Sequence, residues 1–185
     1  MKKILIIDGS PRKGANSDFA AEKLAAFLKE DGAQSETFTL RDKKVTPCVA
    51  CDTCKKTDVC IHKDDMAEFN AKLEKADGVA LLSPIYFGGL PGTVKTLIDR
   101  FYVFFNPAKP PRALTPKKMG IVFSFGTGPA EVYKEVADAT AATFGAVGVT
   151  EHKSLLFGNQ NDCAALAGDT ARQQQLRKLA DYLAK

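Results

Sequence analysis

The sequence predicts an α/β fold in which helices cover both faces of a doubly wound, mostly parallel, five-stranded sheet. Three observations predict it. Short apolar runs recur along the chain, stripes of apolar residues at helical spacing separate them, and 185 residues suit one domain. We therefore expect residues 1–185 to form a single domain.

The first strand and helix show the pattern that the rest of the chain repeats. Residues 4–7 are an unbroken apolar run, as expected for a strand buried on both faces. Apolar residues then recur at helical spacing over residues 20–28, and Gly32 is placed to end that helix. Residues 37–40 alternate polar and apolar side chains, so we expect a second strand with one exposed face.

Further strands and helices follow in alternation. The strands are expected at residues 79–82, 121–123 and 155–157, and the helices at 66–76, 94–105, 132–143 and 176–183. A cysteine-rich insertion, at about residues 41–63, interrupts this alternation. Repeated strand–helix units predict the flavodoxin-type sheet order 2-1-3-4-5, in which a ligand binds beyond the carboxyl ends of the strands.

Composition excludes several classes of protein. The chain carries 26 Lys and Arg against 22 Asp and Glu, and this net charge of +4 is dispersed along it, so no nucleic-acid partner is expected. The apolar runs are too short for a signal peptide or a membrane span, so we expect a cytoplasmic protein without a membrane partner. With only His62 and His152, a histidine metal site or a Ser-His-Asp triad has little support.

The loop after the first strand has the side chains of an anion site. It offers the hydroxyls of Ser10 and Ser17, the amide of Asn16 and the guanidinium of Arg12 beside a helix N-terminus, a combination that suits a terminal phosphate. It matches neither a Walker P-loop nor the Rossmann glycine pattern. The alternative is a simple turn in which Asn16 or Ser17 caps the helix.

Two further loops follow the third and fourth strands. Tyr86 and Phe87 in the first of them suit packing against a planar heterocycle, and Gly88 allows close backbone approach. The alternative is a pair of aromatics that covers the core. The other loop, residues 124–129, is rich in glycine and is expected to lie beside it.

Together these segments resemble the NAD(P)H-dependent FMN reductase family of flavodoxin-like proteins. The resemblance rests on residues 9–12 and 16–17 (GSPR and NS), 83–89 (SPIYFGG) and 97–100 (LIDR), which occur in the family's order along the chain. The cysteine run before residues 64–66 (DDM) further resembles the iron–sulfur flavoprotein branch of that family.

The resemblance implies a binding site for FMN. Its phosphate would be held by Ser10, Arg12, Asn16 and Ser17, its ring by Pro84, Ile85, Tyr86, Phe87 and Gly88, and its far edge by Ser124, Gly126 and Thr127. NAD(P)H would be the hydride donor, and no side chain need act as a catalytic acid or base. A quinone, a free flavin, an iron–sulfur cluster or another small-molecule or protein acceptor would receive the electrons.

Two other functions remain open at this point. One is an electron carrier of the flavodoxin type that has no nicotinamide activity. The other is a redox or metal sensor that works through its cysteines. The family resemblance also implies a homodimer or homotetramer, with residues 101–105 and 106–116 as candidate contacts; core packing and a rigid connector are the alternatives for these segments.

Four cysteines form the most distinctive motif of the chain. Cys48, Cys51, Cys54 and Cys60 have the spacing C-x2-C-x2-C-x5-C, whose first three members match a ferredoxin run, although the last gap is longer. The resemblance implies a 4Fe–4S cluster here. Zinc, a redox-active thiol pair and a loop without metal stay open, and Cys163 lies far away in the sequence.

Overall fold

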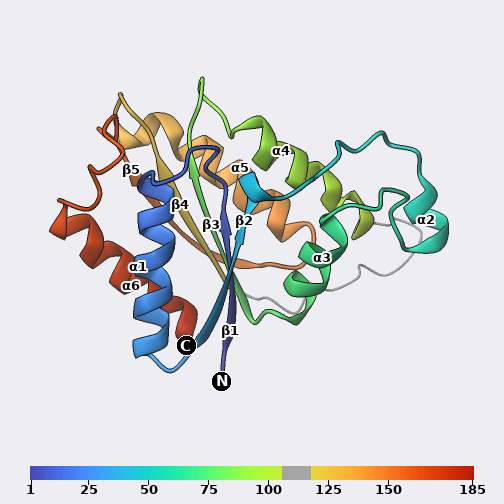
Figure 1. Ribbon diagram of the computed structural model, residues 1–185, viewed down its shortest axis with the longest axis horizontal. Coiled ribbons are helices and arrows are strands. Elements are labelled where there is room, and N and C mark those ends of the chain that lie inside the picture. The colour runs from blue at the N-terminus through green and yellow to red at the C-terminus, as the bar shows by residue number, and fades with distance from the viewer. Residues whose placement is uncertain (106–117) are drawn as a thin grey trace.

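The computed structural model describes residues 1–105 and 118–185. Five parallel strands form one sheet in the order β2-β1-β3-β4-β5 (Figure 1). The strands are β1 (Lys3–Asp8), β2 (Gln34–Thr39), β3 (Gly78–Pro84), β4 (Lys118–Ser124) and β5 (Glu151–Phe157). The predicted fold class and strand order are confirmed.

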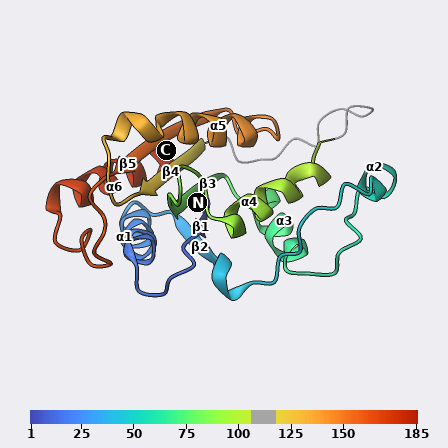
Figure 2. The same ribbon diagram turned by 90° about the horizontal axis from the view of Figure 1, so that it is seen from above.

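Helices cover both faces of the sheet, as Figures 1 and 2 show. They are α1 (Asn16–Glu30), α2 (Thr53–Thr57), α3 (Met66–Lys75), α4 (Gly92–Asp99), α5 (Lys134–Gly145) and α6 (Thr170–Ala184). Ile4 and Ile6 of β1 pack with α1 and α6 on one face, whereas Leu5 and Ile7 pack with α3, α4 and α5 on the other. This alternation explains why β1 reads as an unbroken apolar run.

The helix predicted over residues 94–105 is too long. It ends at Asp99 and continues as a 3-10 turn, η2 (Arg100–Val103), rather than reaching residue 105. Phe101 and Phe104 are buried in the core and Phe105 is half exposed, so most of this aromatic segment is core packing. The other candidate contact, residues 106–116, lies outside the described residues.

The apolar face of α5 differs from the predicted one. Within the predicted helix over 132–143, the residues at helical spacing are Val132, Val136, Ala139 and Thr143. The buried residues are instead Ala137, Thr140, Ala141 and Phe144, and only Val136 of the predicted set packs partly against the core. Val132 lies in a 3-10 turn, η3 (Ala130–Tyr133), and is exposed. A 3-10 helix has 3.0 residues per turn and an α-helix has 3.6. A helical pattern counted from Val132 is therefore out of phase with the α-helix that begins at Lys134.

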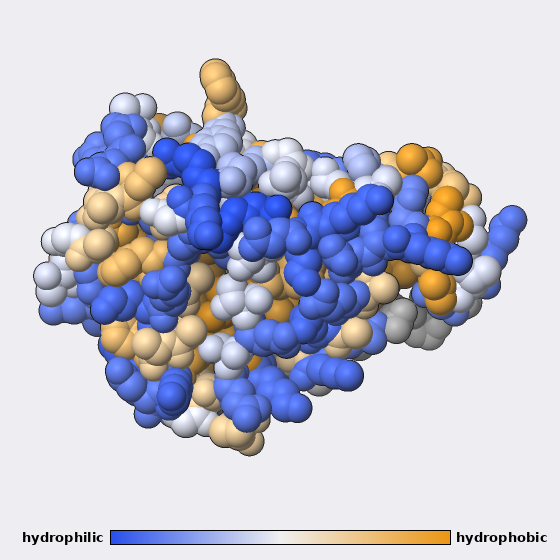
Figure 3. Space-filling model, viewed as in Figure 1, coloured by the Kyte–Doolittle hydropathy of each residue, from blue (hydrophilic) through white to orange (hydrophobic). Residues whose placement is uncertain are grey.

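The cysteine-rich insertion leaves the sheet after a short 3-10 turn, η1 (Leu40–Asp42), and returns at α3. It carries α2 and projects beyond the end of α4 (Figure 1). Hydrophobic side chains gather at this end of the molecule (Figure 3), where Val49, Val59 and Ile61 are exposed. Across residues 1–105 and 118–185, the helices are all too short or too polar to cross a bilayer.

Candidate functional site

The loop after β1 folds back on itself at the carboxyl end of the sheet. The buried Ser10 hydroxyl donates to the carbonyl of Arg12 at 3.1 Å and accepts from the Arg12 N–H at 3.2 Å. The N–H of Ser10 donates to Oδ1 of Asp8 at 3.1 Å. These bonds curl the backbone around Ser10, while the Arg12 side chain stays exposed.

The simple-turn interpretation of this loop, with Asn16 or Ser17 as the cap, is wrong. The N-cap of α1 is Ala15, which makes no side-chain capping bond. The first N–H groups of a helix have no partner within the helix, so an uncapped N-terminus leaves donors for an anion. Ser17 is buried beside this N-terminus.

Asn16 uses its side chain inside the protein. Its amide nitrogen donates to the carbonyl of Asp162 at 2.8 Å, and its oxygen accepts from the N–H of Leu166 at 3.0 Å. These bonds tie the start of α1 to the loop between β5 and α6. A phosphate at this loop would therefore meet the backbone N–H of Asn16 rather than its amide group.

Arg41 is a residue of this site that sequence reasoning missed. Its Nη1 lies 2.8 Å from Oδ2 of Asp8 and 2.7 Å from Oδ1 of Asp18, so one guanidinium bridges two carboxylates. Asp18 also accepts from the N–H of Gly14 in the same loop. Asp8 and Arg41 are 33 residues apart in the sequence, so no local spacing could have indicated this contact.

The two carboxyl groups have opposite pKa shifts. Burial, followed by the hydrogen bond shared with Asp18, raises the pKa of Asp8 to about 7. For Asp18, partial burial acts upward, but hydrogen bonds to Asp8 and Arg41 outweigh it and lower the pKa. A shared proton between neighbouring carboxyl groups produces such a split.

The loop after β3 forms a tight two-residue turn. Tyr86 and Gly89 exchange backbone hydrogen bonds of 2.9 and 3.0 Å, and Phe87 and Gly88 lie between them in left-handed conformation, with φ of 47° and 79°. Two-residue hairpin turns with positive φ at both central positions favour glycine there, so Phe87 is an uncommon residue at the first of them. Its side chain is fully exposed, so it does not cover the core as the alternative interpretation required.

Backbone contacts join this loop to the one after β4. The N–H of Ile85 donates to the carbonyl of Ser124 at 2.8 Å, and Pro84 and Ile85 are buried. Ser124 and Gly126 are half-buried, whereas Thr127 is exposed. The structure therefore brings the predicted ring-binding residues to one region at the carboxyl ends of β3 and β4.

The loop between β5 and α6 also belongs to this region, although no motif marks it in the sequence. Asn161 donates to the carbonyl of Gly126 at 3.2 Å, and a Cβ at Gly126 would lie only 2.1 Å from the Asn161 side chain. Gln160 is buried, and its Oε1 has no hydrogen-bond partner among the described residues. A buried acceptor left without a donor is free to accept from a water or a ligand.

The four cysteines of the insertion meet at one small cavity. Cys48, Cys51, Cys54 and Cys60 line about 20 Å³ of space together with His62, Arg100 and Tyr102, and all four thiols are free. This volume is about that of a single water molecule. Within residues 1–105 and 118–185, no group of three or more His, Cys, Asp or Glu is already arranged to hold a metal ion.

The thiols differ in their surroundings. Burial raises the pKa of Cys54, the innermost of them, whereas hydrogen bonds with Thr53 lower the pKa of the exposed Cys51. Nε2 of His62 is buried at this cavity and has no partner among the described atoms. Cys163 lies elsewhere, on the loop before α6, and is exposed.

A buried ion pair closes the base of the insertion. Arg100 donates to both carboxylate oxygens of Asp64, at 2.7 and 3.1 Å, and to the carbonyl of Thr46 at 2.7 Å. Asp64 also accepts from the Thr46 N–H at 2.8 Å. Next to this contact, the Lys44 N–H donates to the Asp65 carboxylate at 2.6 Å, and the Asp65 N–H donates to the Lys44 carbonyl at 3.0 Å. Asp99, the sequence neighbour of Arg100, pairs with Lys95 instead.

The insertion itself carries backbone strain. Ala50, Asp52 and Asp58 all adopt left-handed φ, between 50° and 60°. An alanine in this region costs about 1–2 kcal/mol. Lys55 of α2 holds the insertion against η2, donating to the carbonyls of Tyr102 and Phe105 and lying 3.4 Å from the centroid of the Tyr102 ring.

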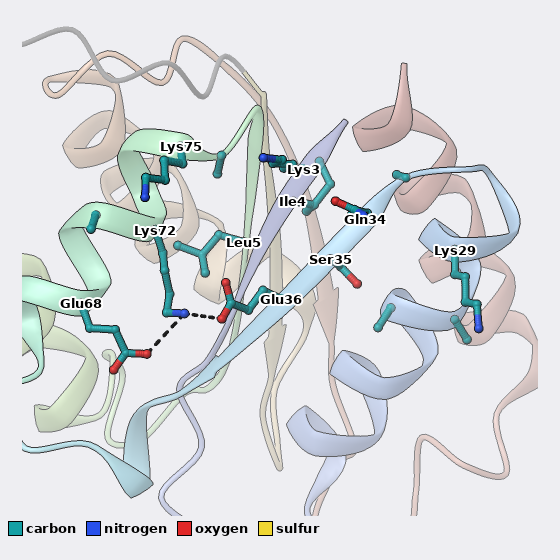
Figure 4. A pocket seen from close by; sticks show the side chains of 15 residues that line it. Lys3, Ile4, Leu5, Lys29, Gln34, Ser35, Glu36, Glu68, Lys72 and Lys75 are labelled. Carbon is teal, nitrogen blue, oxygen red and sulfur yellow. Dashed lines mark hydrogen bonds and ion pairs between the residues drawn. The ribbon is translucent and has the colours of Figure 1, made fainter. Parts of the chain in front are cut away.

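A cavity of about 960 Å³ lies away from both sites. It follows the edge strand β2 between α1 and α3 (Figure 4) and is lined by the first residues of β1 and β2. Lys72 in this groove pairs with Glu36 and Glu68. Because ligands of parallel sheets bind at the carboxyl ends of the strands, this groove beside an edge strand is not the cofactor site.

Comparisons with known proteins identify the family of the chain. The chain matches the profile of the family described as NADPH-dependent FMN reductase over residues 2–160. An iron-sulfur flavoprotein of Methanocaldococcus jannaschii is 40% identical over 125 residues, 67% of this chain and 61% of that protein. One of Methanosarcina thermophila is 39% identical over 98 residues, 53% of this chain and 51% of that protein. The chain thus spans about half to three fifths of these relatives.

Solved structures share the fold at low sequence identity. An NAD(P)H:quinone oxidoreductase from Methanothermobacter marburgensis superposes with a TM-score of 0.73 at 16% identity, covering 99% of this chain and 97% of that one. An FMN-dependent NADH-azoreductase of Bacillus anthracis, solved with FMN, gives 0.69 at 16% identity and covers all of both chains. The profile match, the curated relatives and the sheet order agree: the chain belongs to the NADPH-dependent FMN reductase family, and its curated relatives are iron–sulfur flavoproteins, as the resemblance predicted.

Proposed function

We propose that this protein is an FMN-dependent oxidoreductase that takes a hydride from NAD(P)H and passes the electrons to a second acceptor. The observation that carries the proposal is the meeting of three loops, after β1, β3 and β4, at the carboxyl ends of adjacent strands. In a sheet of this order, a ligand binds at that edge, where the strand order reverses between β1 and β3.

The loop after β1 would hold the FMN phosphate. Ser10 and Ser17 place buried hydroxyls there, and the uncapped N-terminus of α1 adds N–H groups, including that of Asn16. The exposed Arg12 guanidinium can close over the phosphate with two parallel hydrogen bonds.

The ring and the ribityl chain would lie against the other loops. Pro84, Ile85, Tyr86, Phe87 and Gly88 would support the ring, and Ser124, Gly126 and Thr127 would border its far edge. A Cβ at Gly88 would have no neighbour within 4 Å, so the backbone there is open to a ligand. The orphaned Oε1 of Gln160 is an acceptor that a ribityl hydroxyl could satisfy.

Bound FMN supplies the redox chemistry, accepting a hydride and releasing electrons singly or in pairs. The chain would orient the ring toward the nicotinamide and keep one ring face against protein. No titratable side chain needs to exchange a proton with the nicotinamide. The acceptor would be a quinone, a free flavin or a cluster held by the cysteines.

The cysteines would hold an iron–sulfur cluster, as the names of the curated relatives suggest. The donor set fits, because Cys48, Cys51, Cys54 and Cys60 bring four free, soft sulfur ligands to one cavity. The Arg100 guanidinium faces Cys60 and can offset the negative charge of thiolates. Because the described residues are not already arranged to hold a metal ion, the thiols must change position to bind a cluster.

We also propose that the protein forms a homodimer or homotetramer. Exposed apolar side chains lie at both candidate sites: Val49, Val59 and Ile61 on the insertion and Phe87 on the ring-binding loop. Burial of such side chains between copies is favourable.

Purification without oxygen would test this function directly. A flavin spectrum with broad brown absorbance and about four irons per chain, together with NADH or NADPH oxidation that requires an added quinone or flavin, is the expected result. A yellow protein without iron would keep the reductase and remove the cluster. A colourless protein that does not bind added FMN would overturn the proposal.

Matched variants separate the two sites. Arg12→Ala should weaken FMN affinity about tenfold or more, the value of a hydrogen bond to a charged group, while Lys13→Ala next to it should not. Cys54→Ser should lose iron but keep FMN, and Cys163→Ser should keep both. Equal FMN affinity in Arg12→Ala and the unmodified protein would contradict the phosphate assignment.

A further inference from the structure

We propose that binding of the FMN phosphate at the loop after β1 takes up one proton, which the paired carboxyl groups of Asp8 and Asp18 receive. The proposal rests on the proposed function, because it requires FMN to bind at this loop.

The carboxyl groups already occupy donors of the anion loop. Asp8 accepts from the N–H of Ser10 at 3.1 Å, and Asp18 accepts from the N–H of Gly14. Both are N–H groups of the loop that would surround the phosphate. An incoming phosphate must therefore settle against two carboxyl groups that bind the same stretch of backbone.

The charges near Asp8 do not compensate for both carboxylates and a phosphate. Arg41 is the cation that contacts them, with its Nη1 shared between Asp8 and Asp18 at 2.8 and 2.7 Å. On the strands beside Asp8, the register partners Thr39 and Leu82 carry no charge. The exposed Arg12, the proposed partner of the phosphate, offsets only one charge of the dianion, and solvent screens the exposed Lys13.

With both carboxyl groups ionised, this cluster has a net charge of about −1 before a phosphate dianion arrives, and like charges disfavour each other's ionised forms. Protonation of one carboxyl group removes one of the negative charges. The new O–H can donate to the other carboxylate, while Arg41 continues to contact both. The proton comes from solvent, and no covalent bond other than the O–H bond forms or breaks.

The ionisation of Asp8 supports this assignment. Burial raises the pKa of Asp8 to about 7, so near neutrality the proton is added at little cost. A bound dianion raises that pKa further. Above neutrality, the free protein has lost the proton and the complex has regained it, so affinity falls as pH rises.

The test compares the affinities of FMN and riboflavin, measured by flavin fluorescence between about pH 7.5 and 9, where a phosphate monoester with a second pKa near 6 is already dianionic. The dissociation constant of FMN should rise up to about tenfold per pH unit, whereas that of riboflavin, which lacks the phosphate, should stay flat. Titration calorimetry at about pH 8, in two buffers of different ionisation enthalpy, should count about one proton taken up per FMN bound.

Two variants locate the proton. Asp8→Asn, which mimics the neutral carboxyl group, should bind FMN with little dependence on pH. Glu22→Gln removes an exposed carboxylate one turn after Asp18 on α1 and should behave as the unmodified protein. The proton count needs no variant, so it stays decisive even if Asp8→Asn folds poorly.

The outcomes are distinct. Parallel pH profiles for FMN and riboflavin, with no proton uptake, would overturn this proposal and leave the proposed function intact. Proton uptake that persists in Asp8→Asn would place the proton elsewhere and also overturn it. Absence of FMN binding at every pH would instead refute the proposed function.

Discussion

The loops proposed to bind FMN and the cysteine insertion differ in how the chain supports them. The loop after β1 follows directly from a strand that is buried beside β3. The backbone of this loop packs closely on α4, because a Cβ at Gly9 would lie 2.5 Å from the Val94 side chain. The insertion has few buried side chains, three left-handed non-glycine residues and exposed Val49 and Val59. Tertiary packing therefore holds the first region, and a few polar clamps at its base hold the second.

This difference implies that the two regions depend differently on their ligands for stability. A preformed loop on a packed scaffold can bind its ligand without large rearrangement. A strained, lightly packed insertion can change shape at small cost, and a ligand that crosslinks its cysteines would stabilise it as a disulfide or metal does in a small domain. The following predictions change the clamps and the strain in turn.

Loss of the Arg100 clamp should have the largest effect. Arg100→Met leaves the carboxylate of Asp64 buried without its cation, and removal of one partner of a buried pair costs about 3–5 kcal/mol. We expect the free energy of unfolding, measured with urea, to fall by that amount. Limited proteolysis should cut within the insertion first.

The matched control is Lys95→Met on the same helix, which breaks the exposed pair with Asp99 and should cost less than about 1 kcal/mol. Similar losses in the two variants would mean that the Arg100 clamp contributes no more than a surface ion pair.

Lowering the pH should reduce the stabilisation by the Arg100–Asp64 pair, with an effect on the free energy of unfolding smaller than that of Arg100→Met. Burial acts to raise the pKa of Asp64, but hydrogen bonds from Arg100 and Thr46 prevail and lower it to about 2. A lowered pKa means that the stabilisation is complete above the usual carboxyl pKa of about 4 and is lost as pH falls toward 2. Its size is about 2 kcal/mol. The unfolding free energy of Asp64→Asn, measured over the same pH range, should lack this component.

Relief of strain in the insertion should have the smallest effect. Ala50 has φ of 50°, so Ala50→Gly should stabilise the protein by up to about 1 kcal/mol. The same substitution at Ala26, an exposed position inside α1, should destabilise it by about 0.5–1 kcal/mol. Thermal unfolding of the two variants measures both signs, and a destabilised Ala50→Gly would contradict the strain at that position.

Local patterns predicted the sheet and the place of the site. Residues 4–7 and 79–82 are unbroken apolar runs because both faces of β1 and β3 are covered. These runs therefore identify the two strands and the positions of the loops that follow them. The sequence also marked the loops that contain Ser10 and residues 85–89, because each loop follows a buried strand.

Contacts between distant residues could not be predicted in this way. Arg41 meets Asp8, and Arg100 meets Asp64, across 33 and 36 residues, and no local rule pairs them. The capping interpretation of Asn16 failed for the same reason, since its amide bonds residues about 150 positions away. The face of α5 was misplaced because a 3-10 turn precedes that helix.

The bonds between Lys44, Thr46, Asp64 and Asp65 have a consequence for how the chain can be re-engineered. They hold the residues on either side of segment 47–63 within hydrogen-bond distance of each other. The entropy of closing a loop between fixed ends grows only slowly with its length. We therefore expect that this segment can be shortened to a turn, or exchanged for another ligand-binding loop, while the sheet and the loops at its carboxyl edge keep their shape.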